Sequence, residues 1–376
     1  MIAMLRLMSF GNWRSVHDNK RIGLPFGLNS QGAGLFAEHR DLTTYELSAS
    51  VMAGLYAAVE QGEKAQGSTS PNPPVGAAVV SSQGDIVGVG CTQPVGGPHA
   101  EVMALQAAGT AARGATIMVT LEPCQHQGRT GPCTQALLDS GIAEVIYCLK
   151  DPGGKEGGGH EFLQKNGVRV TFLDLPIRAL RPWLQAQHLQ RPYVVGKSAH
   201  TIDGFIAAVD GTSQWITGEA ARSYATNQRK MFDAIVVGTG TALADNPRLT
   251  ARDPKGKELL SQPLRVVVGS RTLPESAHLN DPTVLKFLDL DEALHNLWDR
   301  GCRYVLLEGG AGLIASAFES GVIDEFHDYS APLFLGAGRN ALARSISPTL
   351  SDATHMHTQR VELLGEDVLR VLVRQQ

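Results

Sequence analysis

Residues that can bind one metal ion lie in three separate segments of this chain. His99-Ala100-Glu101 opens a stretch with helical spacing, Cys124 follows a strand-like run over 116–121, and Cys133 comes after eight intervening residues. For these ligands to meet, the start of one helix, the end of a strand and the start of a second helix must lie side by side. The pattern therefore predicts a helix–strand–helix arrangement that holds His99, Cys124 and Cys133 around one ion.

This predicted ligand set suits zinc chemistry. One neutral imidazole and two thiolates bind Zn²⁺ and leave its fourth position open for water, which becomes a hydroxide nucleophile near neutral pH. Glu101, two residues from His99, can carry the proton of that water to a leaving ammonia. H-x-E followed by P-C and a second Cys is typical of hydrolytic deaminases. A structural zinc site beside an uninvolved Glu101 is the alternative.

Length and charge narrow the class of substrate. The chain has 376 residues and a net charge of −4, and its length favours two domains. Between residues 45 and 150 there are four basic residues against eight acidic ones. A protein that binds a nucleic-acid backbone presents a basic surface, so we expect a small-molecule substrate and no nucleic acid.

Cysteine usage and hydropathy indicate the compartment. Five cysteines at irregular spacing argue against a disulfide framework and favour the reducing cytoplasm. No stretch approaches the roughly 20 apolar residues of a membrane-spanning helix, so we expect no membrane association. The apolar residues 1–8 are too few for a secretory signal, and no cleavage site follows them. A plastid or mitochondrial address within residues 1–42 is the alternative.

Hydrophobic periodicity and the positions of glycine and proline divide the chain into four parts. We expect a poorly ordered extension over 1–42, a first domain over 43–175, a linker over 176–192 with three prolines, and a second domain over 193–376. In the first domain, helical and strand-like runs alternate in a way that predicts a mixed sheet with packed helices. In the second, strands are predicted near 193–195, 234–237, 264–268, 304–307 and 368–373, and helices near 219–230, 291–300 and 313–320.

From residue 45 to residue 373 the sequence resembles the bifunctional deaminase/reductase family of riboflavin biosynthesis. Most similar is the loop between the two cysteines, which has eight residues and includes His126 and Arg129, whereas cytidine and tRNA-adenosine deaminases have two there. The resemblance implies a cytidine-deaminase-like first domain. It also implies that the first reaction removes the 2-amino group of 2,5-diamino-6-ribosylamino-4(3H)-pyrimidinone 5′-phosphate. Asn72, His126 and Arg129 are then the candidate substrate contacts, although Asn72-Pro73 is also ordinary turn chemistry.

The second domain resembles the family's reductase, which is similar to dihydrofolate reductase and uses NADPH to reduce the ribosyl group to ribityl. The resemblance assigns substrate contacts to Ser213, Arg229, Leu249, Arg252 and Glu308, with the two arginines as phosphate clamps. It assigns NADPH contacts to Ala199, Trp215, Thr241, Asp245, Gly310, Ala311, Gly312, Leu313, Ile314, Ala315 and Ser316. No G-x-G-x-x-G opens a helix, but the glycines near 309–312 can bring backbone N–H groups to a pyrophosphate. Alternatively, the glycine cluster forms only a tight turn, and Trp215 is a core residue without a role in binding.

Several residues depart from the family pattern and keep other functions open. Phe205 stands where a basic residue is common, which permits a deaminase with an impaired reductase. Asp151-Pro152-Gly153-Gly154, Gln125 and Gly131 also differ from the usual residues, but every predicted zinc ligand is retained. A nucleoside or tRNA deaminase and a non-catalytic metal-binding protein are further alternatives. We expect the protein to form a homo-oligomer.

Overall fold

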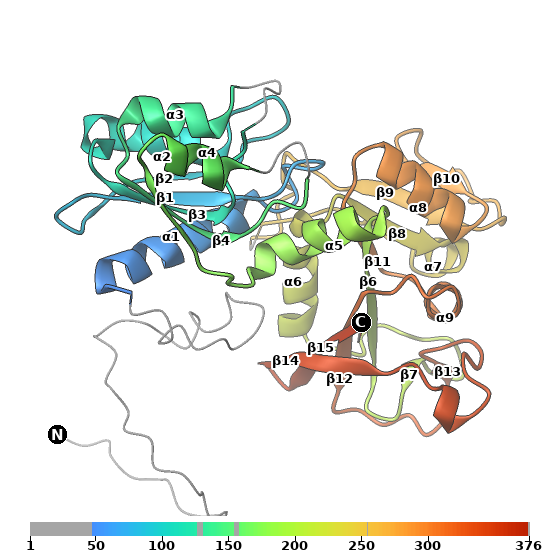
Figure 1. Ribbon diagram of the computed structural model, residues 1–376. Helices are drawn as coiled ribbons and strands as arrows, with labels where there is room; N and C mark the ends of the chain where they lie inside the picture. The colour runs from blue at the N-terminus through green and yellow to red at the C-terminus, as the bar shows by residue number, and fades with distance from the viewer. Residues whose placement is uncertain (1–46, 126–130, 154–157, 254, 375–376) are drawn as a thin grey trace, which may run out of the picture.

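The computed structural model describes residues 47–125, 131–153, 158–253 and 255–374, which form two α/β domains joined by a helix (Figure 1). The N-terminal domain is built on a five-stranded sheet and the C-terminal domain on an eight-stranded sheet. The predicted N-terminal extension over 1–42 lies outside the described residues, and so do His126 and Arg129.

The five-stranded sheet is mixed, as predicted, with the strand order β2-β1-β3-β4-β5. β1 is antiparallel to β2 and β3, whereas β3, β4 and β5 are parallel to one another. Its elements are α1 (Ala49–Ala65), β1 (Gly76–Val80), β2 (Ile86–Cys91), α2 (Ala100–Ala108), η3 (Gly109–Ala112), β3 (Thr116–Leu121), α3 (Cys133–Ser140), β4 (Glu144–Leu149), α4 (Gly159–Lys165) and β5 (Arg169–Phe172).

Helices cover both faces of this sheet, and glycines set how closely they approach. A Cβ at Gly76 of β1 would lie 1.9 Å from the Ala58 carbonyl oxygen of α1, and a Cβ at Gly90 of β2 would lie 2.6 Å from the Ala100 carbonyl oxygen of α2. Gly76 is paired with Cys91, the neighbour of Gly90, so the two glycines face opposite sides of the sheet. α1 and α2 therefore pack on opposite faces, and only glycine permits this spacing.

The eight-stranded sheet has the order β10-β9-β8-β11-β6-β12-β15-β14. Its strands are parallel from β10 to β12, and β15 and β14 are added antiparallel at one edge. The elements are β6 (Tyr193–Thr201), β7 (Phe205–Ala207), α6 (Glu219–Gln228), η5 (Arg229–Met231), β8 (Ala234–Gly238), α7 (Thr239–Asp245), β9 (Leu264–Val268), β10 (Leu285–Phe287), α8 (Leu290–Asp299), β11 (Tyr304–Leu307), α9 (Ala311–Glu319), β12 (Glu325–Ala331), β13 (Arg339–Asn340), η6 (Leu350–Asp352), β14 (Met356–Leu364) and β15 (Asp367–Arg374).

Buried apolar side chains alternate along the parallel strands and form a core on each face of the sheet. Val236 and Val305 belong to the core that includes α8 and α9, whereas Ile235 and Leu306 belong to the core on the other face. This two-sided burial is what a mostly parallel sheet requires, and it leaves the carboxyl ends of β8 and β11 as the open edge.

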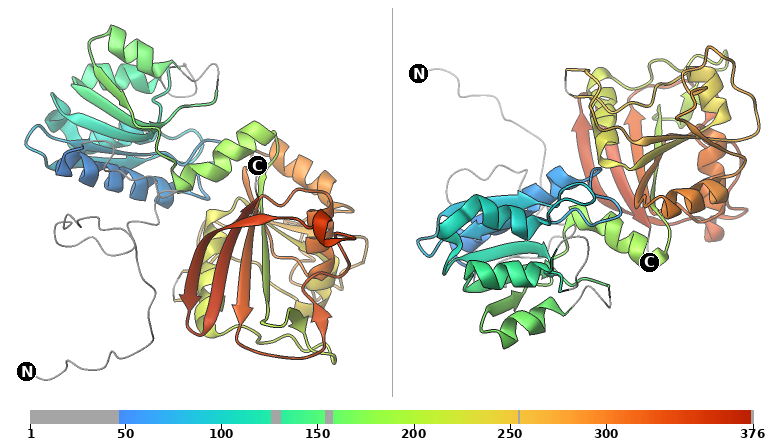
Figure 2. Two further views of the ribbon diagram at one scale, coloured as in Figure 1. Left: turned by 60° about the horizontal axis from the view of Figure 1, so that its bottom comes forward. Right: turned by 90° about the horizontal axis from the view of Figure 1, so that it is seen from above.

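The segment predicted as a linker, residues 176–192, is folded. It contains η4 (Arg178–Leu180) and α5 (Arg181–Leu189), the helix between the two domains in Figures 1 and 2. Leu180 lies fully buried in the core of the N-terminal domain, and Ala186 lies fully buried in a core of the C-terminal domain. α5 is therefore a packed part of both domains.

Candidate functional site

The three predicted metal ligands meet at the amino ends of two helices. His99 is the N-cap of α2, and Cys133 is the first residue of α3. Cys124 follows the end of β3 and is tied to α3, because its carbonyl oxygen accepts a hydrogen bond from the Thr134 N–H at 3.2 Å. Helix amino ends carry partial positive charge, so they favour the negative charge of a thiolate.

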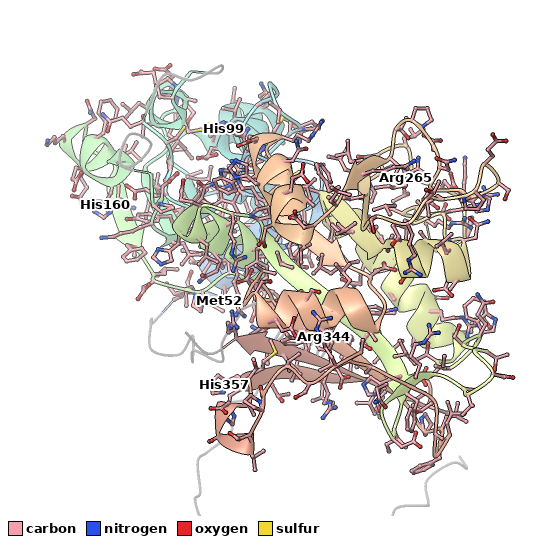
Figure 3. All side chains as sticks on the ribbon, turned by 90° about the vertical axis from the view of Figure 1, so that its right-hand side faces the viewer. Met52, His99, His160, Arg265, Arg344 and His357 are labelled. Carbon is pink, nitrogen blue, oxygen red and sulfur yellow. The ribbon has the colours of Figure 1, made fainter. Side chains whose placement is uncertain are left out.

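The chain after β3 is held in place by its neighbours. The Glu122 N–H donates to the Leu149 carbonyl oxygen at 2.8 Å, and the Glu122 carboxylate accepts the His160 N–H at 3.1 Å. A Cβ at Gly159 would lie 2.0 Å from the Pro123 carbonyl oxygen, so α4 packs tightly against this turn. Figure 3 shows His99 and His160 together in the N-terminal domain, away from Arg265 in the C-terminal domain.

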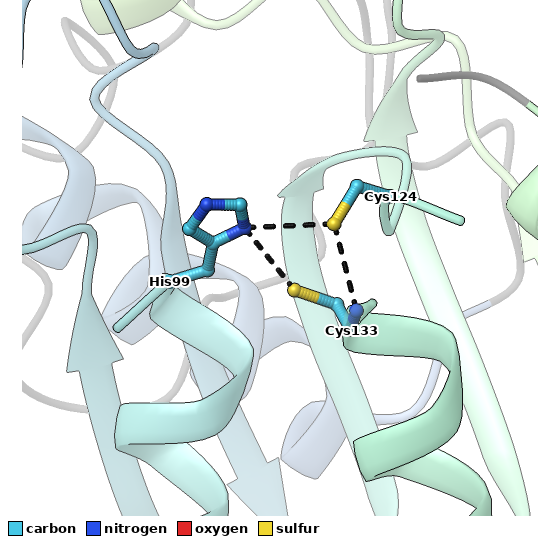
Figure 4. A group of neighbouring side chains, drawn as sticks. All are labelled: His99, Cys124 and Cys133. Carbon is cyan, nitrogen blue, oxygen red and sulfur yellow. Dashed lines mark hydrogen bonds between the residues drawn. The ribbon is translucent and has the colours of Figure 1, made fainter. Parts of the chain in front are cut away.

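The ligand atoms lie close enough to bind one ion. His99 Nδ1 is 3.5 Å from Cys124 Sγ and 3.3 Å from Cys133 Sγ, and one ligand atom from each residue lies within 4.8 Å of the others (Figure 4). Both cysteines are buried. One imidazole nitrogen and two sulfur atoms in a buried cluster fit zinc, and the chemistry of the donor set leaves one position for water.

The thiols of Cys124 and Cys133 shift each other's pKa in opposite directions. The hydrogen bond from the Cys133 thiol lowers the pKa of Cys124 to about 4, with His99 acting in the same direction. The Cys133 N–H also donates to Cys124 Sγ at 3.5 Å. The same bond to Cys124, together with burial, raises the pKa of Cys133. A bound metal ion would hold both cysteines deprotonated.

Glu101 lies in the same cavity as His99 and Cys124, and it is almost fully buried, with 4% of its surface exposed. Burial raises the pKa of Glu101 to about 7, and the negative charge of Cys124 adds to the effect. A carboxyl group that exchanges its proton near neutral pH is suited to general acid–base chemistry.

This cavity has a volume of about 940 Å³. Asn72, predicted to contact substrate, lines it, and so does Asp151 from the Gly-rich loop. The other two predicted contacts, His126 and Arg129, lie outside the described residues. Sequence reasoning missed the contribution of α5, whose Trp183 and His188 also line the cavity. The sequence analysis did not identify these two residues as cavity residues, because the prolines of 176–192 are typical of a linker.

In the C-terminal domain, Arg229 and Glu308 form a half-buried ion pair. Arg229 Nε donates to Glu308 Oε1 at 2.7 Å, and Nη2 donates to Oε2 at 2.8 Å. Burial acts to raise the pKa of Glu308, but the charge and hydrogen bonds of Arg229 hold it below its usual value. The guanidinium predicted as a phosphate clamp thus binds a carboxylate, while Nη1 donates to the Thr250 carbonyl oxygen at 3.3 Å.

Lys197 is a functional candidate that the sequence analysis did not single out. Its ammonium lies 5.5 Å from the centroid of the Tyr329 ring, and it interacts electrostatically with Glu308, Arg229 and Asp245. Burial lowers the pKa of Lys197. A lysine within the apolar strand β6 was the available signal, because a buried lysine needs a partner or a role.

Most of the predicted NADPH contacts lie in the two helices that follow the carboxyl ends of β8 and β11, namely α7 and α9. Gly310 is the N-cap of α9, no side chain caps that helix, and the Gly310 N–H donates to Thr241 Oγ1 at 2.9 Å. Asp245 ends α7, and burial raises its pKa. Uncapped N–H groups at the start of a nine-residue helix fit a pyrophosphate. The remaining predicted contacts in α9 are Ala311, Gly312, Leu313, Ile314, Ala315 and Ser316.

Other predicted residues of this domain have distinct surroundings. Trp215 is 66% exposed and stacks with Arg222, whose guanidinium carbon lies 4.3 Å from the ring centroid, so Trp215 is not a core residue. Leu249 is buried with a positive φ of 54°. Arg252 Nη2 lies 3.4 Å from Glu258 Oε1. Ser213 and Ala199 are half-buried.

The fold and the ligand cluster together define a protein whose N-terminal domain is a zinc-dependent deaminase of the cytidine deaminase type. Residues 52–149 match the family model of the cytidine and deoxycytidylate deaminase zinc-binding region, and residues 192–370 match the RibD C-terminal domain. The chain is similar to riboflavin biosynthesis protein RibD of Corynebacterium ammoniagenes, with 50% identity over 80% of this chain and 91% of that protein. It is 43% identical to RibD of Mycobacterium tuberculosis strain H37Rv, over 84% of this chain and 95% of that protein.

Solved structures agree with these relatives. Acinetobacter baumannii RibD superimposes with a TM-score of 0.78 at 32% identity, covering 87% of this chain and 99% of that one. The deaminase/reductase of Thermotoga maritima gives a TM-score of 0.75 at 30% identity, covering 87% and 99%. The chain therefore belongs to the RibD family of riboflavin biosynthesis. It is a bifunctional enzyme, a zinc-dependent deaminase and an NADPH-dependent reductase.

Proposed function

We propose that this enzyme deaminates 2,5-diamino-6-ribosylamino-4(3H)-pyrimidinone 5′-phosphate and then reduces the ribosyl group of the product to ribityl. The observation that carries the proposal is the cavity in which His99, Cys124 and Glu101 meet. The Thermotoga maritima relative supports the choice of substrate, because its description names a diaminohydroxyphosphoribosylaminopyrimidine deaminase and 5-amino-6-(5-phosphoribosylamino)uracil reductase.

In the deaminase, His99, Cys124 and Cys133 would hold the zinc ion, which would supply a hydroxide nucleophile from water. Glu101 takes the proton of that water and returns it to the departing ammonia, because it is buried in the same cavity and its pKa is raised to about 7. Asn72 lines the cavity and orients the pyrimidine. His126 and Arg129 are assigned to the ribosyl phosphate by resemblance.

In the reductase, NADPH supplies the hydride, and the chain holds the two ligands in place. The N-cap and the first six residues of α9, from Gly310 to Ser316, hold the cofactor together with Thr241 and Asp245. Ser213, Leu249 and Arg252 contact substrate, and Arg229 positions the Glu308 carboxylate through two hydrogen bonds. We add Lys197 as a substrate contact, because this half-buried lysine interacts electrostatically with the same carboxylate.

The surroundings of Phe205 give no reason to propose an impaired reductase. Its N–H donates to Thr201 Oγ1 at 3.0 Å, and it pairs with Asn340 in the two-stranded sheet of β7 and β13. The ion pair of Arg229 and Glu308 lies elsewhere, at the end of β11. We therefore propose that both activities operate, with the deaminase over 43–175, the reductase over 193–376, and 176–192 between them.

We further propose that the enzyme works in the cytoplasm, on a free small molecule without nucleic acid. The five cysteines are all free, which suits a reducing compartment. No helix among the described residues has the length and apolar content that a membrane crossing requires.

A homo-oligomer is proposed to form through β14, the edge strand of the eight-stranded sheet. Val361 and Leu363 alternate along β14 and are 57% and 76% exposed. An edge strand with exposed apolar residues is a pairing surface. Light scattering should give a mass of more than one 40.1 kDa chain, and Leu363→Lys should shift it toward one. A monomeric wild-type protein would contradict this.

The central experiment supplies the proposed substrate with and without NADPH and follows ammonia and NADPH consumption separately. Ammonia should appear without NADPH, and NADPH should be consumed only after deamination. Ammonia release without any NADPH consumption would favour the impaired reductase. No ammonia from zinc-loaded protein would refute the proposed substrate.

A further inference from the structure

The cavity that holds the zinc ligands has a wall that the deaminase fold itself does not supply. α5 contributes Trp183, Gln187 and His188 to the lining, although the family model of the zinc-binding region ends at residue 149. The helix that connects the two domains is thus part of the deaminase pocket.

α5 is held firmly enough to act as a wall. Trp183 Nε1 donates to the Pro71 carbonyl oxygen at 2.8 Å, directly beside Asn72 in the cavity. One turn earlier, Arg178 forms an ion pair with Glu63 of α1 at 2.6 Å. Because both domain cores also bury residues of 177–186, the position of α5 relative to the zinc ligands is fixed before substrate binds.

The two ends of the cavity differ in polarity. Beside His99 and Glu101, the lining includes Val75 and Leu121, which are 7% and 3% exposed. Such an end suits a flat pyrimidine ring that must reach the metal. The α5 side is more open, because His188 is exposed and Gln187 half-buried. The part of the substrate that projects away from the ring must therefore extend toward polar groups.

Gln187 and His188 are available to bind that part. Gln190 folds back onto the helix, and its Nε2 donates to the Gln187 carbonyl oxygen at 2.6 Å. Within the described part of the chain, the side chains of Gln187 and His188 make no hydrogen bond of their own. An amide offers both donors and acceptors, as a sugar hydroxyl needs, and an imidazole N–H can donate to a phosphate oxygen.

We propose that α5 forms a subsite of the deaminase, in which Gln187 and His188 bind the ribosyl phosphate portion of the substrate. The inference rests on the proposed function and adds two specificity residues to it. The helix between the domains then selects a phosphorylated ribosyl pyrimidine over a free pyrimidine, and it does so by binding rather than by chemistry.

The test measures deamination by the full-length zinc-loaded enzyme with Gln187→Ala and His188→Ala. Each variant should raise KM for the phosphorylated substrate about 3- to 10-fold with kcat nearly unchanged, because one hydrogen bond to substrate is lost. For the dephosphorylated substrate, His188→Ala should have little effect. Zinc content, thermal unfolding and NADPH-dependent reduction of already deaminated substrate should match the wild type.

A matched pair of charge variants provides the control. Gln187→Glu should raise KM more than Gln187→Ala does, because a carboxylate repels the phosphate, and added salt should reduce the difference. Gln185→Glu makes the same change on the same helix, but Gln185 lines a different cavity and should leave KM unchanged. Equal KM values for wild type, Gln187→Glu and His188→Ala would overturn the subsite. In that outcome ammonia release by the wild type still supports the proposed function, whereas its absence defeats the function itself.

Discussion

At the residue scale, one carboxylate in each domain lies away from solvent beside groups that offset the free-energy cost of its burial. Glu101 lies beside the metal ligands, and Glu308 is neutralised by Arg229 through two hydrogen bonds. An ionised carboxylate without such a partner would be costly in the interior. The sequence predicted Glu101, Glu308 and Arg229 as site residues, and the assignment of Arg229 to a phosphate stays a prediction. The pairing could not be foreseen, because β8 and β11 become neighbours only in the folded sheet.

The role of Glu101 can be tested by removing its proton without changing its shape. Glu101→Gln should retain zinc, because all three ligands remain. Deamination should fall by at least ~10²–10⁴-fold, the range for loss of a general acid–base group. NADPH-dependent reduction of already deaminated substrate should continue and serves as the control. A Gln variant that releases ammonia at nearly the wild-type rate would exclude Glu101 as the proton carrier.

Of the two arginines predicted to bind phosphate, Arg252 is the more exposed and has the weaker carboxylate partner. Its side chain is 35% exposed, and its ion pair with Glu258 is at the solvent edge, where such pairs contribute little. Arg252→Ala should raise KM for the phosphorylated reductase substrate about 10- to 100-fold, as expected for ~1.5–3 kcal/mol of charged hydrogen bonding. NADPH affinity should hardly change. An equal loss with dephosphorylated substrate would show that Arg252 supports the fold instead.

At the scale of elements, strands with continuous apolar runs were predicted well, and polar strands were missed. β8, β9 and β11 lie where the sequence indicated, and so do α3, α8 and α9 within a few residues. β12 has the sequence EFHDYSA, which has no apolar pattern. Its polar residues are buried because they satisfy one another: His327 Nε2 lies 2.7 Å from Glu325 Oε1, and the Tyr193 hydroxyl donates to Glu325 Oε2 at 3.1 Å. The first pair lies within β12 and the second joins β6 to β12, and neither leaves a periodic apolar signal in the sequence.

A second polar pair on β12 predicts how stability depends on pH. His200 of β6 is hydrogen-bonded to Asp328, and this bond raises the pKa of His200. The histidine therefore stabilises the fold fully below its unfolded pKa of about 6.5, and this contribution is lost as the pH rises through the folded pKa. His200→Gln should lower the melting temperature more at pH 6 than at pH 9. A penalty that is the same at both values would contradict the charged pair.

The titration of Asp328 provides a control for this prediction at low pH. Burial acts to raise the pKa of Asp328, but the hydrogen bonds from His200 and Arg370 hold it below its usual value. Its contribution is present above about pH 4 and is lost as the pH falls through the folded pKa. The stability difference between wild type and His200→Gln should therefore shrink again in strong acid.

At the scale of the whole molecule, two domains that were predicted to be joined by a linker share a packed boundary. The Ser70 hydroxyl donates to Asp233 Oδ2 at 2.7 Å, and the same oxygen accepts the N–H groups of Arg303 and Tyr304. A Cβ at Gly67 would lie 1.9 Å from the Lys230 carbonyl oxygen, so the backbones of the two domains are in close contact. The sequence indicated the composition of each domain, but a contact between segments about 160 residues apart depends on the finished surfaces of both.

This boundary changes the fragment that should fold alone. A reductase fragment that begins at residue 190 would lack α5, although Ala186 is fully buried in the core with Tyr193 and Val195. A fragment that begins at residue 176 keeps this contact, but it exposes Leu180, which the N-terminal core normally covers. Removing α5 uncovers apolar surface over several strands, so the shorter fragment should be less stable, at about 25 cal/mol for each Å² of apolar surface exposed.

We therefore expect the fragment from 176 to melt at the higher temperature, to contain no zinc and to bind NADPH. Calorimetry on the two fragments with Leu180→Ser in the longer one, to offset its exposed apolar surface, measures the difference. Equal melting temperatures would mean that α5 belongs energetically to the deaminase alone.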